Sequence, residues 1–309
     1  MSFLDKDGNP TGYSIDLCKC IVTEVENKIG VDVKVEYVPV TADGRFKALG
    51  NNKIDILCGS TTKTLSRSEL VDFTQLTFVT GASLMTLKEN KAHDSDGFDG
   101  KKIGVVEATT TAAELKKLFQ DTSTDAEVVL FNSAKENIDA LRKKKIDAFS
   151  SDQIVLIGIA IKAHDPMNFE ISDGVFSFEP FALAVRRNDA DFRLVADRVI
   201  SDLYRSKKIL EIYDKWIGKF TGLKLGLAYG GTGYEQQKQA IEDGRDVLAG
   251  PPGRGTPGRA LGEVKAGSGA SPQPTGPDPN RHAPPHPALR NHPPPPPTPS
   301  VCEAPYSAP

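Results

Sequence analysis

The 309-residue sequence predicts an α/β fold followed by a disordered tail, and three observations support this. Short apolar strands alternate with longer helices from residue 14 to about residue 221, which is typical of sheets covered by helices. Polar breaks at 88–100 and 172–179 favour a middle lobe, 88–183, inserted into a first lobe made of 1–87 and 184–221. Beyond residue 221 the composition changes, since 18 of the 22 prolines and 14 of the 27 glycines lie there.

The elements follow from apolar spacing. Residues 14–29 place apolar side chains at helical intervals, and 31–37 then alternate apolar with charged residues, which predicts a helix followed by a strand. The next elements are a helix near 43–50, strands at 54–57, within 76–87 and at 102–106, a helix at 112–119, a strand at 127–130, a helix at 134–143 and a strand at 146–149. After Asp152 come a helix to 163, strands at 169–171 and 181–185, and helices at 190–204 and 207–220. This order favours parallel sheets.

The tail, 222–309, is expected to be disordered because from residue 251 onward it contains no Ile, Phe, Met or Trp. Such a segment cannot bury enough apolar surface to offset its ordering entropy. Its run Pro293–Pro297 is compatible with a polyproline II ligand of SH3-like domains. A non-native extension is the favoured interpretation, because the composition changes abruptly where the tail begins.

Charge and hydropathy exclude some classes of protein. The 38 basic and 41 acidic residues give a net charge of −3, without the basic segment that nucleic-acid binders carry. No apolar stretch approaches the roughly 20 residues that cross a bilayer. The start, Met1–Asp5, lacks the basic and apolar regions of a signal peptide.

The cysteines are Cys18, Cys20, Cys58 and Cys302. Cys18 and Cys20 point to different faces of the first helix, so they make a poor disulfide or metal pair. Without zinc spacing, buried or incidental thiols are the expected interpretation, and neither a metal nor a cofactor is predicted.

Polar groups follow three strands of the predicted sheets. After the strand at 54–57 comes Gly59–Arg67, where hydroxyls and free backbone amides lead into a helical turn, with Arg67 placed to grip a carboxylate. Glu107–Thr111 repeats this pattern, and Asp152 ends a third strand. Together these groups complement a zwitterion, with Arg67 and the backbone amides facing its carboxylate and Asp152 facing its ammonium. The alternatives are helix capping by Thr109–Thr111 or Asp152, and a surface ion pair of Arg67.

Several segments resemble one family: Gly12–Leu17, Gly59–Thr62 with Arg67, Val71–Thr74, Gly100–Val105, and Ile209–Gly218 with Trp216. They are similar to the polar-amino-acid substrate-binding proteins of ABC importers (bacterial extracellular solute-binding proteins, family 3), nearest the glutamate/aspartate branch. The resemblance covers about residues 1–221. It implies a two-lobed periplasmic binding protein (Venus flytrap) fold with crossover strands near 84–88 and 181–186, and a periplasmic location.

The resemblance also implies roles for individual residues. Arg67 and the Thr62 amide and hydroxyl would hold the ligand α-carboxylate, and the Ser60 carbonyl and Asp152 the α-ammonium. Thr109 and Thr110 would close the site from the second lobe. The expected partners are an L-amino acid and a membrane permease, with the chain a monomer.

The chain also departs from the family. It begins inside a loop that follows the family's first strand, so that strand of lobe 1 is expected to be missing and the chain to be truncated. Ser83 stands where the glutamate/aspartate branch has an arginine for the side-chain carboxylate, so an amino-acid ligand is still expected but selectivity for an acidic side chain is not. Ala108 replaces a usual glycine. Leu183 stands where Cys58 would find its partner, so that disulfide is expected to be absent.

A solute-binding component of an amino-acid importer, not an enzyme, is therefore the predicted function. Two alternatives remain: a ligand-sensing receptor domain, and a dehydratase-like enzyme on the same scaffold. The enzyme would need a positioned general acid in the cleft.

Overall fold

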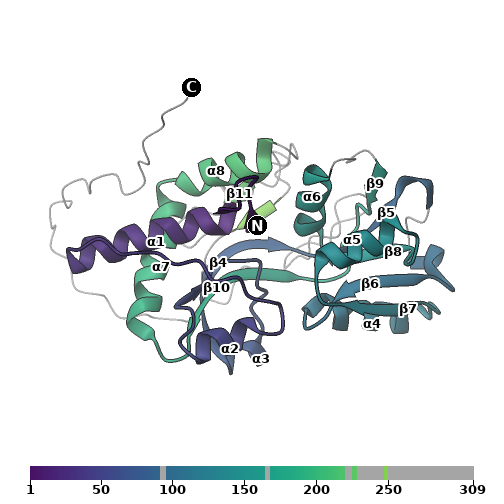
Figure 1. Cartoon of the computed structure of the whole chain (residues 1–309), viewed down its shortest axis with the longest axis horizontal. Coiled ribbons are helices and arrows are strands. Elements are labelled where there is room, and N and C mark those ends of the chain that lie inside the picture. The colour runs from purple at the N-terminus through teal and green to yellow at the C-terminus, as the bar shows by residue number, and fades with distance from the viewer. Residues whose placement is uncertain (91–94, 164–167, 220–224, 228–246, 250–309) are drawn as a thin grey trace, which may run out of the picture. The chain divides into compact units, whose positions relative to one another are not determined.

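Two β-sheets carry the fold, and helices pack on each of them (Figure 1). The computed structural model describes residues 1–90, 95–163, 168–219, 225–227 and 247–249. We call the part built on the three-stranded sheet the first lobe and the part built on the five-stranded sheet the second lobe. The α/β, two-lobed architecture predicted from the sequence is confirmed.

The sheet of the first lobe has the order β3-β10-β4, with neighbouring strands antiparallel. Its strands are β3 (Ile56–Leu57), β10 (Glu179–Arg186) and β4 (Val71–Thr80). On one face, Phe78, Phe181 and Leu183 share a core with α1 (Tyr13–Ile29), α7 (Ala190–Arg205) and α8 (Lys208–Tyr213). On the other, a smaller core includes Leu49 of α2 (Arg45–Gly50).

The sheet of the second lobe has the order β7-β6-β8-β5-β9. Its strands are β7 (Glu127–Phe131), β6 (Lys102–Val106), β8 (Ala148–Asp152), β5 (Ala82–Leu87) and β9 (Phe169–Ile171). Strand β6 runs parallel to β7 and β8, whereas β5 runs antiparallel to β8 and β9. Helix α4 (Thr110–Thr122) covers one face, and α5 (Ala134–Arg142) and α6 (Gln153–Lys162) cover the other (Figure 1).

The chain passes between the lobes at Gly81, which separates β4 from β5, and at residues 172–178, which lead from β9 to β10. Both crossings lie ahead of the positions expected near 84–88 and 181–186. We call Gly81 and residues 172–178 the hinge. Strand β5 pairs within the second sheet, although 1–87 was expected to belong to the first lobe.

Smaller elements complete the described chain. They are the hairpin strands β1 (Phe3–Leu4) and β2 (Pro10–Thr11), the helix α3 (Leu65–Ser68), the 3₁₀ turns η1 (Lys88–Asn90) and η2 (Ser95–Phe98), the π-helical turn η4 (Asp214–Gly218), and the parallel strands β11 (Leu225–Leu227) and β12 (Val247–Ala249). Apart from β11 and β12, the predicted tail, including the polyproline run, lies outside the described residues.

Two expectations about strands are wrong. Residues 31–37 form no strand, and Val31 and Val35 are exposed. Alternation alone does not make a strand, because the backbone groups of a strand need a neighbouring strand. Within the described part of the chain, β3 pairs only with β10. The parallel sheets expected from the helix–strand order are also only partly present, because every pairing in the first lobe's sheet is antiparallel.

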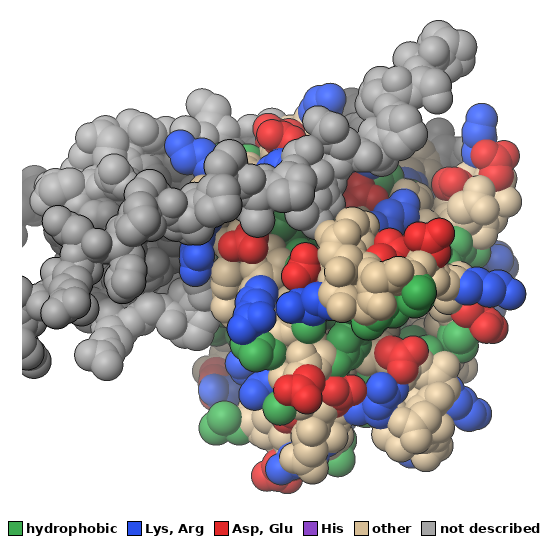
Figure 2. Space-filling view, turned by 90° about the vertical axis from the view of Figure 1, so that its left-hand side faces the viewer, with side chains coloured by type: hydrophobic (Ala, Val, Ile, Leu, Met, Phe, Trp, Pro, Cys, Tyr) green, Lys and Arg blue, Asp and Glu red, His purple; other side chains and the backbone are tan. Residues whose placement is uncertain are grey.

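The surface carries both signs of charge. On the face drawn in Figure 2, acidic and basic side chains are interspersed. Among the described residues, no helix combines the length and the apolar character that a membrane span requires.

Candidate functional site

Arg67 is held by the loop that follows β3. The Thr64 hydroxyl caps α3 by accepting from the Arg67 backbone N–H at 3.1 Å. The Arg67 guanidinium Nη1 donates to the Thr62 carbonyl oxygen at 2.9 Å and lies 5.6 Å from the centre of the Phe46 ring. Burial lowers the pKa of Arg67, while Glu179 and Asp152 counteract that shift. Among the described residues Arg67 forms no ion pair at the surface. The structure therefore gives no support to the alternative that Arg67 is a surface ion-pair residue.

The Thr62 backbone faces the same side as this guanidinium. Thr62 forms an isolated bridge with Phe181, in which the Lys63 N–H donates to Pro180 and the Thr61 carbonyl accepts from Ala182. Because successive groups of an extended chain point in opposite directions, the Thr62 N–H and carbonyl point away from β10. The carbonyl accepts from Arg67, and within the described structure the Thr62 N–H has no partner.

Arg45, at the start of α2, is a second guanidinium that the sequence analysis missed. It lies 5.0 Å from the centre of the Phe46 ring, which Arg67 also contacts. Its Nε is buried without a hydrogen-bond partner among the described residues. Burial and the neighbouring Arg67 lower the pKa of Arg45 to about 10. A cation in the first turn of a helix opposes the helix dipole, and this was the signal available in the sequence.

Asp152 ends β8 and precedes α6. Its side chain makes no capping hydrogen bond to α6, and Oδ1 is buried without a partner in the described structure. Burial, and then the nearby Glu179, raise the pKa of Asp152 to about 7, although Arg67 and Arg45 oppose the shift. An orphaned buried carboxylate oxygen calls for a donor, and a cation would satisfy both its hydrogen bonding and its charge.

Glu179, the first residue of β10, is the second residue that the sequence analysis missed. It is 1% exposed, and its Oε2 accepts hydrogen bonds from the hydroxyls of Thr62 and Thr110, the latter at 2.8 Å. Oε1 accepts from the Ser177 hydroxyl at 2.8 Å. No local pattern marked this residue, because Thr62 and Thr110 lie 117 and 69 residues away from it in the sequence.

These bonds decide what the two threonines can offer a ligand. A hydroxyl has one proton to donate, and both Thr62 and Thr110 donate it to Glu179. The two hydroxyl oxygens can therefore accept hydrogen bonds from a ligand, but their protons are already donated to Glu179. Of the two Thr62 donors expected to hold a carboxylate, the backbone amide is the one left.

Thr109 and Ser60 are placed differently. Thr109 precedes α4, but its hydroxyl donates to the Val106 carbonyl at 2.6 Å and makes no capping bond. Ala108 before it has a φ of 58°, a left-handed conformation that glycine adopts more readily. Ser60 is half-buried and follows Gly59, whose carbonyl accepts from the Ser14 hydroxyl at 3.2 Å.

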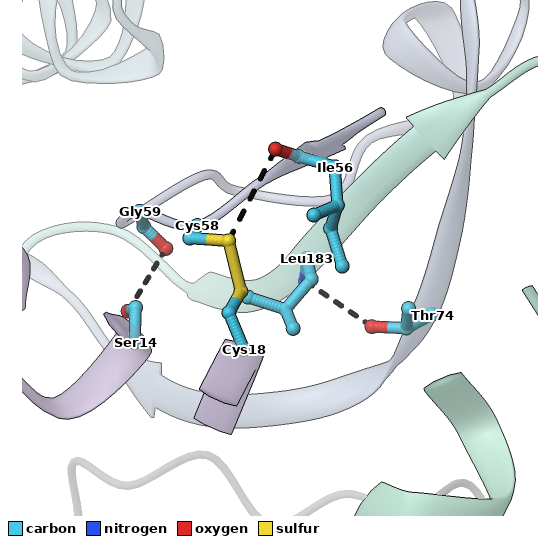
Figure 3. Close-up of a disulfide and its surroundings, with 7 residues drawn as sticks. All are labelled: Ser14, Cys18, Ile56, Cys58, Gly59, Thr74 and Leu183. Atoms are coloured by element: carbon cyan, nitrogen blue, oxygen red, sulfur yellow. Dashed lines mark hydrogen bonds between the residues drawn. A yellow bond between two sulfur atoms is a disulfide. The ribbon is translucent and has the colours of Figure 1, made fainter. Parts of the chain in front are cut away.

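A disulfide joins Cys18 of α1 to Cys58 at the end of β3 (Figure 3). The expectations that Cys58 lacks a partner and that these cysteines are incidental thiols are therefore wrong. The resemblance placed the expected partner at position 183, where this chain has Leu183, but Cys18, which is 40 residues from Cys58, lies within reach of it in the folded chain. Figure 3 shows that Ser14, one turn before Cys18, holds the next residue, Gly59.

The site thus has a cationic part, formed by Arg45, Arg67 and the Thr62 amide, and an anionic part, formed by Asp152 beside Glu179. Such a pair of surfaces complements a small zwitterion. Two surface hollows, of about 450 Å³ at the end of α4 and about 520 Å³ between α1, β4 and α7, include none of these groups. No cluster of side chains suited to a metal ion is found among the described residues.

The curated proteins to which this chain is similar include two glutamate/aspartate-binding proteins. The chain is 33% identical over 210 residues to the L-glutamate/L-aspartate-binding protein of Pseudomonas aeruginosa, covering 68% of this chain and 70% of that protein. It is 29% identical over 216 residues to the glutamate/aspartate import solute-binding protein of Escherichia coli, covering 70% and 72%.

The solved structures to which this chain is similar include amino-acid-binding proteins. An ancestral arginine-binding protein bound to arginine matches with a TM-score of 0.62 and 28% identity, covering 70% of this chain and 92% of that one. The ancestral amino acid-binding protein AncCDT-1, a precursor of cyclohexadienyl dehydratase, matches with a TM-score of 0.58 and 26% identity over 70% and 88%.

The family model for bacterial extracellular solute-binding proteins, family 3, matches residues 1–219. This range contains both lobes and every site residue described above. The chain therefore belongs to the bacterial extracellular solute-binding proteins, family 3.

Proposed function

We propose that this protein is the periplasmic receptor of an amino-acid ABC importer and that it binds an L-amino acid between its two lobes. The observation that carries this proposal is the convergence of Arg45, Arg67 and Asp152, whose buried polar atoms include two without partners in the described structure. A bound amino acid would supply the missing partners, and a membrane permease would receive it.

The α-carboxylate would lie on the Arg67 guanidinium and the Thr62 N–H, which face the same side of the loop. The α-ammonium would lie on Asp152, with the Ser60 carbonyl and the Thr62 and Thr110 oxygens as further acceptors. Thr109 and Thr110 would close the site from the second lobe. A charged hydrogen bond in a water-excluded site is stronger than one at the surface.

Glutamate and aspartate are the ligands that we propose first. Arg45 is a second, half-buried cation, and its buried Nε lacks a partner among the described residues. A side-chain carboxylate would complete that guanidinium, whereas a neutral side chain would leave it unpaired at a cost. The names of two curated relatives, which are glutamate/aspartate-binding proteins, agree with this choice.

The Cys18–Cys58 disulfide supports the proposed location. Disulfides persist in oxidising compartments such as the bacterial periplasm and are rare in the cytosol. A receptor that acts outside the cytoplasmic membrane would keep this bond.

The test is calorimetric titration of the full chain with a panel of L-amino acids, together with Arg67→Ala. We expect micromolar or tighter binding of an acidic amino acid. Arg67→Ala should weaken it about 30- to 1000-fold, because a bidentate charged contact in a closed cleft is worth about 2–4 kcal/mol. Unchanged affinity in Arg67→Ala would refute the carboxylate assignment.

A dehydratase-like activity is the second candidate, because a buried carboxyl with a pKa of about 7 can act as a general acid. The similarity to a precursor of cyclohexadienyl dehydratase adds to this. Incubation with prephenate-like cyclohexadienyl acids separates the two: a receptor leaves them intact, whereas an enzyme protonates the leaving hydroxyl, releases water and carbon dioxide as the ring becomes aromatic, and turns over repeatedly.

A further inference from the structure

Glu179 is a buried carboxylate whose hydrogen-bond donors are hydroxyl groups. It makes no salt bridge within the described residues, so hydrogen bonds, together with the nearby charge of Arg67, must compensate the cost of burying it. Removing one donor from a fully buried carboxylate is costly, because the charge then lacks part of its solvation. The three hydroxyls around Glu179 are therefore strongly held.

Those three donors come from different parts of the molecule. Thr62 belongs to the loop after β3 in the first lobe, and Thr110 begins α4 in the second lobe. The two hydroxyl oxygens lie 3.4 Å apart. Ser177 belongs to the hinge. One carboxylate thus joins both lobes to the segment that connects them.

Ser177 also contacts Ala82, which follows Gly81 at the other crossing of the hinge. The Ser177 hydroxyl oxygen accepts from the Ala82 N–H at 3.0 Å, and the Phe176 N–H donates to the Ala82 carbonyl at 2.9 Å. A side chain at Gly81 would collide with the Ser177 carbonyl, so the two crossings are in close contact. Hydrogen bonds therefore run from Ala82 through Ser177 and Glu179 to Thr62 and Thr110.

We propose that Glu179 is a positioning residue that couples the hinge to the binding cleft. It holds the first turn of α4 against the loop that carries Arg67, and so stabilises the arrangement in which both lobes meet the ligand. This role rests on the proposed function as an amino-acid receptor. Moving Thr110 away from Glu179 would break a charged hydrogen bond, so separation of the lobes and loss of this contact are one event.

The test measures the distance between the lobes in the full chain without ligand. Fluorescent labels are placed through non-canonical amino acids at Lys28 in the first lobe and Lys135 in the second, both exposed. Thr110→Val, which removes the hydroxyl and keeps the shape, should lengthen and broaden the interlobe distance distribution. Glu179→Gln should do the same, and the double variant should change it no further than the larger single effect.

Thr111→Val is the matched control, because Thr111 is buried in the same turn of α4 and no contact with Glu179 is observed. It should leave the distance distribution unchanged. If circular dichroism shows that Glu179→Gln does not fold, the distance distribution of Thr110→Val alone tests the proposal. Distances equal to those of the parent protein in Thr110→Val would overturn the proposal.

A second measurement follows L-glutamate dissociation by stopped-flow fluorescence. Loss of a charged hydrogen bond that exists only when the lobes are together should raise the dissociation rate about tenfold in Thr110→Val. If the parent protein binds no amino acid, the proposed function is refuted. The interlobe distances measured without ligand then still test the role of Glu179. A parent protein that binds glutamate, with a Thr110→Val variant that dissociates at the parent rate, would count against Glu179 alone.

Discussion

Cys18 and Cys58 are joined by a disulfide, with their Cα atoms 6.2 Å apart. This bond attaches α1 to the residue that immediately precedes the Gly59–Arg67 loop. The Ser14 hydroxyl, one helical turn away, holds the Gly59 carbonyl. One face of α1 therefore anchors the start of the loop at two successive residues, once covalently and once by a hydrogen bond.

The double substitution of Cys18 and Cys58 by alanine should lower the free energy of unfolding by about 4 kcal/mol. The crosslink spans 40 residues, and closing a loop of that length in the unfolded chain accounts for a loss of this size. Urea unfolding followed by circular dichroism measures it. Ser14→Ala, which removes only the hydrogen bond, should cost about 1 kcal/mol. An equally stable double variant would contradict the prediction.

Ligand affinity should rise with pH because of Asp152. Its pKa of about 7 means that part of the population is protonated at neutral pH, and an ammonium ligand requires the ionised form. Calorimetry from pH 5 to pH 9 should show affinity increasing up to about pH 8 and then levelling, with proton release on binding near pH 7. Asp152→Asn should weaken α-amino ligands and remove the dependence, while a des-amino analogue is little affected. Equal losses for both ligands would rule out the ammonium role.

The stability of the ligand-free protein should change with pH in the opposite direction. The carboxyl pKa is raised from 3.8 to about 7 by folding, so the folded state binds this proton more tightly than the unfolded state. The resulting stabilisation is full below about pH 4 and is lost as pH rises to about 7. Thermal unfolding of the parent protein and Asp152→Asn across this range isolates the contribution, which should be missing from the variant.

Arg45 should select for an acidic side chain. Arg45→Gln should weaken L-glutamate by about 10- to 100-fold, since a charged contact is lost, and should change L-glutamine much less. Arg67→Ala should weaken both ligands, because both carry an α-carboxylate. Arg198→Ala, at an exposed position of α7, is the control and should alter neither affinity. An unchanged ratio of the glutamate and glutamine affinities in Arg45→Gln would remove Arg45 from the site.

Gly81 should tolerate no side chain. A Cβ there would collide with the Ser177 carbonyl and with Val175 at 2.6 Å, so Gly81→Ala must displace backbone in the hinge. We expect a loss of about 1–3 kcal/mol in the free energy of unfolding, as for other overpacked sites. Gly158→Ala, in α6 with no atom within 4 Å, should instead gain about 0.5–1 kcal/mol. Similar stabilities of the two variants would show that the crossings are not in tight contact.

Some helices and strands could be predicted from the local sequence pattern, because interactions between neighbouring residues specify them. Apolar spacing predicted α1, and the strands β6 and β9 were predicted with the bounds that the structure has. Helix periodicity and strand alternation are properties of neighbouring residues, so they can be read without knowledge of the fold. The same holds for the Gly59–Arg67 loop, whose glycine, hydroxyls and arginine lie together in the sequence.

Long-range contacts decided the rest. Residues 31–37 have the alternation of a strand, but no neighbouring strand pairs with them, and pairing is a property of the sheet. Cys58 has a partner because α1 brings Cys18 to it, across 40 residues. Arg45 and Glu179 join the site only when α2 and β10 pack beside the loop after β3. The sequence alone therefore determined the fold class and the kinds of groups in the site, while the tertiary structure decided which distant side chains meet, because burial and hydrogen bonding between them exist only in the packed chain.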